Sequence, residues 1–225
     1  GHAKLGARDR KSGRWSVLYL GKAQIARIAS GEIRVAGRHH KGFLELEADA
    51  ESIKRSVKTV WNRPQHSAGE HGSRLLRDIL PQRGFPFPKS LYAVEDALKI
   101  AVAHKRDAVI LDFFSGSGTT AHAVMRLNRQ DGGSRQCISV TNNEVSADEQ
   151  ANLRKQGLRP GDAEWEKWGI CEYITKPRIR AAITGLTPSD EPIKGDYKFV
   201  DEFAMAEGFE ENAAFFTLSY ESPWM

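Results

Sequence analysis

The sequence predicts an α/β protein in which helices flank a parallel sheet, preceded by a small β-rich segment. Three observations lead to this prediction. Strand-like and helix-like patterns alternate from Ser73 onward, as they do in βαβ units. An apolar run at residues 108–114 leads directly into a turn of glycine and small hydroxyl residues. The first sixty residues instead contain short runs of partly alternating polarity.

Three short runs in the N-terminal part are predicted as strands: residues 14–20 (RWSVLYL), 32–36 (EIRVA) and 42–48 (GFLELEA). Glycine-containing turns, SGE and HHKG, separate them. Residues 52–73 follow, and their glycine and proline content predicts an extended connection rather than a long helix.

Basic residues gather near the N-terminus: Arg8, Arg10, Lys11 and Arg14. They are compatible with phosphate contacts, although a solvated end is the preferred interpretation.

Two helices are expected before the central apolar run. Residues 73–80 (SRLLRDIL) form a short helix that Pro81 ends. The following FPFPK cannot be helical, because each proline disfavours α geometry in the residue before it. Residues 89–105 (KSLYAVEDALKIAVAHK) then predict an amphipathic helix, with its apolar stripe formed by Leu91, Val94, Leu98 and Val102.

The central apolar run begins a strand–helix–strand pattern. Residues 108–114 (AVILDFF) read as a buried strand, and residues 119–130 (TTAHAVMRLNRQ) as a helix that DGG ends. Residues 137–142 (CISVTN) read as a second strand. A strand, a helix and a further strand in this order predict a parallel pair.

A third helix is expected after the second strand. Ser146 and Glu149 have the spacing of a capping box that opens it, and Gly157 closes it. After Gly185 the chain becomes polar and proline-containing, and residues 206–220 (AEGFEENAAFFTLSY) restore apolar density.

Composition limits the classes of function. Apolar residues make up 40% of the chain and charged residues 28%, and no apolar stretch is long enough to span a bilayer. The net charge of +4 is compatible with a polyanionic partner without requiring one. Cys137 and Cys171 have no Cys or His at metal-ligand spacing, so no metal site is predicted. A reducing, intracellular setting fits this cysteine usage.

The turn at residues 113–119 follows the carboxyl end of a predicted strand, where ligands bind in open parallel sheets. Gly116 and Gly118 allow the backbone to approach a ligand closely. The helix that follows points its N-terminal N–H groups at the same place.

Four interpretations of this turn compete. A nucleoside triphosphate site is set aside, because no lysine follows Gly118. A dinucleotide fingerprint is matched weakly, with Ala121 at its third glycine position. S-adenosylmethionine carries no phosphate and suits a turn of small residues beside an acid, here Asp112. The fourth interpretation is a turn that only packs a helix on a strand.

An acid after the second strand often accepts hydrogen bonds from ribose hydroxyls, and Glu144 stands there. An exposed loop carboxylate explains Glu144 equally well. Neither H-E-x-x-H nor G-x-S-x-G occurs, so metalloprotease and α/β-hydrolase chemistry have no support.

Taken together, several segments resemble one family. LDFFSGSGTTAHAV resembles the S-adenosylmethionine (SAM) motif of amino-group DNA methyltransferases. HSAGEHGSRLLRDIL, FPFPKSLYAVEDAL, ISVTNNEV, PGDAEWEKWGI, YITKPRIRAAITG and AEGFEENAAFFTLSY are similar, in this order, to the modification subunit of type III restriction systems. The resemblance covers about Trp61 to Tyr220. It implies a Rossmann-like fold, adenine-N6 methylation of duplex DNA and SAM as cofactor.

The resemblance also implies residue roles. The floor of the SAM pocket and the helix start beside it are expected from Asp112, Phe113, Phe114, Ser115, Gly116, Gly118, Thr119 and Thr120. The methionine end is expected to be lined by Pro88, Lys89 and Ser90, and Glu144 is expected to contact the ribose. The implied organisation is a β-rich segment at 1–60, a SAM-binding core at 61–187 and an extension at 188–225.

The family's catalytic motif, D-P-P-Y or a close variant, does not occur in this sequence, because no two of its nine prolines are adjacent. No catalytic residue is therefore assigned. We expect this chain to be the SAM-binding portion of a larger or split bacterial or archaeal methyltransferase, inactive alone.

The expected partners are duplex DNA, the N-terminal catalytic half of the same enzyme and a restriction endonuclease subunit, with no membrane. A non-catalytic SAM-sensing or DNA-binding module and, more weakly, an NAD-dependent oxidoreductase remain the alternatives.

Overall fold

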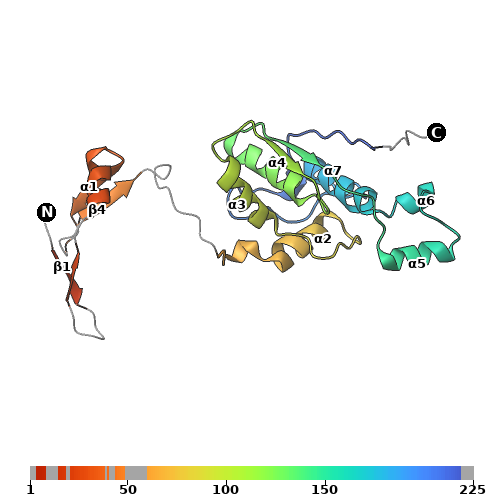
Figure 1. Ribbon diagram of the computed structural model, residues 1–225, viewed down its shortest axis with the longest axis horizontal. Helices are drawn as coiled ribbons and strands as arrows, with labels where there is room; N and C mark the ends of the chain where they lie inside the picture. The colour runs from red at the N-terminus through yellow and green to blue at the C-terminus, as the bar shows by residue number, and fades with distance from the viewer. Residues whose placement is uncertain are drawn as a thin grey trace, which may run out of the picture. The chain divides into compact units, whose positions relative to one another are not determined.

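A computed structural model describes residues 4–8, 15–18, 21–38, 40, 44–48 and 60–218, with side chains from residue 21 onward except that of Ala48. The chain divides into two compact units, Gly1–Lys58 and Thr59–Met225, and Figure 1 shows their elements. In the described part of the chain, no helix combines the length and the hydropathy needed to cross a membrane.

The described residues of the first unit form two antiparallel strand pairs and one helix. β1 (Lys4–Arg8) pairs with β2 (Trp15–Leu18), and β3 (Ile33–Arg38) pairs with β4 (Leu44–Ala48). The three predicted strands correspond to β2, β3 and β4 in the described residues. The side chains of the basic N-terminal residues lie outside the described part.

The helix of the first unit, α1 (Lys22–Ala29), was not predicted. Six of the eight residues in its sequence KAQIARIA are Ala, Lys, Gln or Arg, which are good helix formers. Gly21 precedes it, and the Gln24 side chain accepts a hydrogen bond from the Gly21 N–H (3.2 Å). The segment was not predicted as a helix because the alternating runs on either side of it indicated strands.

The second unit begins with a helical segment that is longer than predicted. A π-helical turn, Gly69–Arg74, continues into α2 (Leu75–Ile79). Gly72 allows this segment to lie against the Pro88–Lys89 backbone, because a Cβ at Gly72 would lie only 2.4 Å from the Pro88 carbonyl oxygen. Residues 52–59 of the predicted extended connection lie outside the described part, and the prediction is wrong where the chain forms a 3₁₀ turn at Pro64–His66 and the π-helical turn that begins at Gly69.

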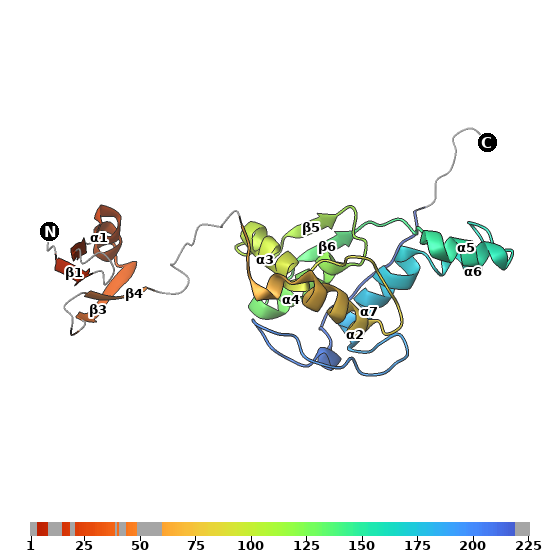
Figure 2. The same cartoon turned by 90° about the horizontal axis from the view of Figure 1, so that it is seen from below.

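The centre of the second unit is a strand–helix–strand unit that follows α3 (Leu91–Val102). β5 (Val109–Asp112) leads through the glycine turn into α4 (Thr119–Asp131), and β6 (Gln136–Ser139) returns parallel to β5. The predicted parallel sheet is therefore confirmed as a small one. In the described part it contains these two strands, which lie side by side in Figure 2.

The prediction that residues 108–114 form a buried strand is wrong for one face of the sheet. The exposed fractions are 60% for Val109, 61% for Leu111 and 60% for Phe113, and Ile138 on β6 is 52% exposed. The alternate residues, Ile110 and Asp112 with Cys137 and Ser139, are half-buried. We call the four exposed residues, Val109, Leu111, Phe113 and Ile138, the apolar stripe.

The core lies on the helical side of the sheet. It is formed by side chains from α2, α3, α4 and the later helix α7 (Lys176–Thr184), together with aromatic residues of the C-terminal loops. α4 is its centre, because every residue from Ala121 to Asn128 is buried. α7 packs against α4 and α2, as Figure 1 shows.

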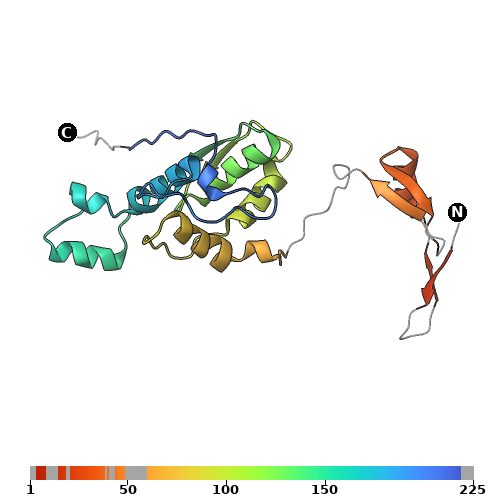
Figure 3. The same cartoon turned by 180° about the vertical axis from the view of Figure 1, so that it is seen from behind.

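Two further helices, α5 (Ala147–Lys155) and α6 (Ala163–Glu166), lie side by side at one end of the second unit (Figures 1 and 3). Ser146 caps α5 as predicted, accepting a hydrogen bond from the Glu149 N–H (3.4 Å). Their small core contains Val145, Leu153 and Trp165.

Candidate cofactor-binding site

The glycine turn joins β5 to α4 at the carboxyl end of the parallel pair. Gly116 and Gly118 have φ angles of +50° and +74°, a left-handed geometry that is strained for residues with a Cβ. The Gly118 N–H donates to the Ser115 carbonyl (2.9 Å), and the Ser115 N–H donates to the Val140 carbonyl just past β6 (3.0 Å). The turn is thus tied to both strands and directs the N-terminus of α4 toward the end of the sheet.

The side chains of the turn divide into exposed and buried groups. Asp112 is half-buried, and its Oδ1 accepts a hydrogen bond from the Phe114 N–H (3.2 Å). The Phe113 and Phe114 rings lie on the surface, with Phe114 89% exposed. Ser115 is buried, and its Oγ has no hydrogen-bond partner in the described part of the chain.

The segment before α3 reaches the turn through Phe85. A Cβ at Gly116 would lie 3.5 Å from the Phe85 ring. The Ser90 hydroxyl has a structural role, because its Oγ donates to the Gln65 carbonyl (2.7 Å) and caps α3 by accepting from the Ala93 N–H (3.4 Å). Pro88 is buried and Lys89 is exposed. Within the described residues, neither a hydrogen bond nor an ion pair joins Lys89 to the turn.

Glu144 lies beyond β6 and is exposed. Its Oε2 lies 3.5 Å from the Asn142 Nδ2, and its carbonyl accepts from the Ile170 N–H (3.0 Å). The structure places it past the same end of the sheet as the turn, without a hydrogen bond to the turn residues.

Two residues of the helical segment that contains α7 hold the turn from behind, and the sequence prediction missed them. Thr175 donates to the Gly116 carbonyl (2.5 Å), and Arg178 donates to the Thr119 hydroxyl (2.8 Å). The sequence signal that could have indicated them is the presence of a threonine and an arginine on the same helical face as the apolar Ile179. Thr120 is half-buried beside Thr119 at the start of α4.

Behind the turn, His122 is completely buried in α4. Its Nε2 lies 2.7 Å from the Tyr197 hydroxyl. Burial, reinforced by the positive charges of Arg178 and Arg126, holds the pKa of His122 well below its usual value. The imidazole is therefore neutral and inaccessible, which gives it a structural role.

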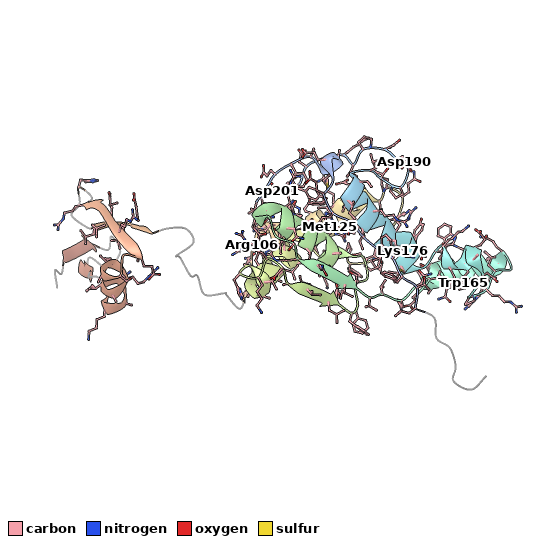
Figure 4. The ribbon with its side chains drawn as sticks, turned by 90° about the horizontal axis from the view of Figure 1, so that it is seen from above. Arg106, Met125, Trp165, Lys176, Asp190 and Asp201 are labelled. Carbon is pink, nitrogen blue, oxygen red and sulfur yellow. The ribbon has the colours of Figure 1, made fainter. Side chains whose placement is uncertain are left out.

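A cavity of about 1050 Å³ lies next to the turn, between α4, β6, α7 and residues 211–218, and Thr175, which is bonded to the turn, lines it. Met125 and Lys176 line it from α4 and α7 and are labelled in Figure 4. Asp112, the glycine turn and Glu144 do not line it. The turn combines main-chain donors, an acid and an unpaired buried hydroxyl, so it is the candidate cofactor site.

The described residues contain no cluster of His, Cys, Asp and Glu that could hold a metal ion. Burial raises the pKa of Cys137 and of Cys171, so both thiols stay protonated near neutral pH.

Comparison with known proteins identifies a family whose sequence model covers the turn. The sequence model of a family described as DNA methylase matches residues 26–159. The EcoPI Mod subunit, a type III restriction-modification protein of Escherichia phage P1, is 34% identical over 147 residues, which cover 65% of this chain and 21% of that protein.

Two further relatives show similar identities. The StyLTI Mod subunit of the type III enzyme from Salmonella typhimurium is 41% identical over 75 residues, or 33% of this chain and 11% of that protein. The type II methyltransferase M.KpnI of Klebsiella pneumoniae is 35% identical over 126 residues, or 56% and 29%. The chain therefore spans less than a third of each of these relatives.

Proposed function

Because this chain belongs to the DNA methylase family, we propose that it is the SAM-binding portion of an enzyme that methylates adenine N6 in duplex DNA. The observation that supports this most directly is the glycine turn, which lies at the carboxyl end of a parallel strand pair with Asp112 before it and the α4 N-terminus after it. The fold proposed for the complete enzyme is the Rossmann-like methyltransferase fold, of which β5, α4 and β6 form one βαβ unit.

The residues of the turn fit the charges of SAM. SAM supplies a methyl group activated by a sulfonium. Asp112 would accept hydrogen bonds from its cationic amino group, and the N-terminus of α4 would favour its carboxylate. Ser115 offers an unpaired hydroxyl in the same turn, and Glu144 would accept from the ribose hydroxyls.

Titration calorimetry with SAM, S-adenosylhomocysteine and NAD tests this proposal. We expect binding of the first two ligands and none of NAD. Asp112→Asn should weaken SAM about 10- to 100-fold, the range for a hydrogen bond to a charged group. Asp107→Asn, before the opposite end of β5, should leave the affinity unchanged. Tight NAD binding without SAM binding would overturn the proposal.

The isolated chain is proposed to transfer no methyl group. A D-P-P-Y-type motif would hold the target amine and stack on a flipped base, and the 225 residues contain no adjacent prolines. A filter assay with tritiated SAM and unmethylated duplex DNA measures transfer directly. Turnover by the purified chain would contradict this part of the proposal.

We propose that the catalytic half of the enzyme docks on the apolar stripe and extends the sheet from β5. The face that carries Val109, Leu111, Phe113 and Ile138 is not covered by any described element, and β5 pairs only with β6 among the described strands. A two-stranded sheet is marginal alone. Burying four such side chains, each more than half exposed, would contribute roughly 4 to 7 kcal/mol.

A charge placed in the stripe tests this docking. Leu111→Lys should change the melting temperature of the isolated chain little, because the side chain is 61% exposed, but should abolish methylation by the complete enzyme. Ile100→Lys, at a 49% exposed position on α3, is the matched control and should retain activity. Full activity of Leu111→Lys would exclude this surface.

The remaining partners follow from the relatives, whose names describe restriction-modification subunits. We propose duplex DNA as substrate, an endonuclease subunit as partner and the cytoplasm of a bacterial or archaeal cell as location. Gel-shift titration of the complete enzyme with duplex DNA, and co-purification of an endonuclease subunit with it, test the first two.

A further inference from the structure

Two polar side chains lie directly behind the glycine turn and are bonded to it. Thr175 and Arg178 are 3% and 0% exposed. The Thr175 hydroxyl donates to the Gly116 carbonyl at 2.5 Å. The Arg178 Nη1 lies 3.2 Å from the Ser117 carbonyl, 3.1 Å from the Ser117 Oγ and 2.8 Å from the Thr119 Oγ1.

The same helical face packs on the turn without space between them. A Cβ at Gly118 would lie 3.4 Å from the Thr175 Cγ2 and 3.6 Å from the Ile179 Cγ1. Gly116, Ser117, Gly118 and Thr119 therefore each contact this face. Because Gly118 is the N-cap of α4, the contacts fix both the turn and the first residue of the helix.

If Arg178 served only to fill space, its burial at this position would be unfavourable. No ion pair joins it to another described residue, and its Nε and Nη2 have no hydrogen-bond partner. A buried charge without a counter-charge costs free energy. The neighbouring α4 N-terminus is itself electropositive, which raises that cost. An apolar side chain would carry no such penalty.

The unneutralised charge has a use if an anionic group binds in front of the turn. On the proposed function, the carboxylate of the methionine part of SAM lies there, at the α4 N-terminus. Arg178 is too buried to touch the ligand, so its effect is transmitted through the field and through the turn atoms it holds. Burial lowers the pKa of Arg178 to about 10, so the guanidinium remains charged at neutral pH.

We propose that Thr175 and Arg178 are positioning residues for the methionine end of SAM: they fix the glycine turn from behind, and Arg178 adds attraction for the ligand carboxylate. This inference rests on the proposed function of the turn. It assigns a role to residues that do not touch the ligand and that belong to a segment about 60 residues further along the chain.

The experiment compares two ligands that differ at the methionine end. S-adenosylhomocysteine carries the amino acid, and 5′-methylthioadenosine lacks it. Titration calorimetry on the 225-residue chain gives both affinities for the wild type and for Thr175→Val, Arg178→Lys and Arg178→Met. Arg180→Met, an exposed position on the same helix, is the matched control.

We expect Arg178→Met to weaken S-adenosylhomocysteine tenfold or more and 5′-methylthioadenosine less than threefold. Arg178→Lys should recover part of the loss, because it keeps the charge and loses the fork. Thr175→Val should weaken S-adenosylhomocysteine about fivefold, and Arg180→Met should bind both ligands as the wild type does.

Three outcomes would overturn the inference. Unchanged affinities in the Thr175 and Arg178 variants would remove the role while leaving the proposed function intact. Equal weakening of both ligands, accompanied by a lower melting temperature, would assign the pair to stability alone. A wild-type chain that binds neither ligand would overturn the proposed function together with the inference. If Arg178→Met does not fold, Thr175→Val and Arg178→Lys decide the question.

Discussion

The close approach at Gly72 gives a sharp test of how the second unit is packed. A Cβ at this position would lie 2.4 Å from the Pro88 carbonyl oxygen and 3.1 Å from that of Lys89. Both are main-chain atoms, so no flexible side chain can move aside. In Gly72→Ala, either the π-helical turn Gly69–Arg74 or the segment before α3 must shift.

The magnitude follows from two opposing effects. Overpacking a well-packed region costs about 1 to 3 kcal/mol, whereas alanine in place of glycine within a helix stabilises by about 0.5 to 1 kcal/mol. We expect a net loss of roughly 1 to 2 kcal/mol for Gly72→Ala. Gly69→Ala in the same turn has only the Ser67 Oγ at 3.9 Å and should show the gain alone.

Thermal unfolding followed by circular dichroism measures both variants against the wild type. A change of 1 kcal/mol shifts the melting temperature of a domain of 150–250 residues by about 2 to 4 °C. Gly72→Ala should therefore melt roughly 2 to 8 °C lower and Gly69→Ala slightly higher. If Gly72→Ala melts at or above Gly69→Ala, the two backbone segments are not in the contact described.

Two further predictions concern charged and titrating groups of the core. Glu95→Ala should lower the free energy of unfolding by about 3 to 5 kcal/mol in chemical denaturation, because it leaves the fully buried Arg126, 2.8 Å away, without its counter-charge. The control Glu164→Ala, in an exposed ion pair, should change the free energy of unfolding by less than about 0.5 kcal/mol. Equal losses in the two variants would contradict this prediction. His122 stays neutral when folded and gains a proton when unfolded below about pH 6.5, so the unfolded state binds more protons and stability falls as the pH drops. When the pH falls from 7.5 to 5.5, the free energy of unfolding of His122→Gln should therefore decrease by about 1.4 kcal/mol less than that of the wild type. An identical pH dependence of the two proteins would show that the histidine titrates alike in the folded and unfolded states.

The parts of the fold that the sequence predicted well are those set by local signals. α4 was expected at residues 119–130 and is found at Thr119–Asp131, bounded by Gly118 and Gly132 in left-handed conformations. Ser146 caps α5 through a bond three residues along the chain. Such signals depend on neighbouring residues, so they can be read without knowing the tertiary structure.

The exposure of β5 could not be predicted in the same way. A short apolar run has the same appearance whether one or both faces of the strand are covered. Whether Leu111 is exposed depends on which elements pack on the sheet, and β5 itself carries no information about them. The roles of Thr175 and Arg178 are hidden for a related reason, because each acts on atoms about 60 residues away in sequence.

The position of the core explains how a turn can be well held beside an incomplete sheet. α4 is buried along Ala121–Asn128 by α3, α7 and the C-terminal aromatic residues, all on the side of the sheet away from the apolar stripe. The contacts that fix the turn, from Thr175 and Arg178, come from that same side. Covering the stripe is therefore not needed to shape the turn. It follows that substitutions of Val109, Leu111 or Ile138 should impair assembly with the catalytic half while leaving the affinity for S-adenosylhomocysteine unchanged, and substitutions behind the turn should do the reverse.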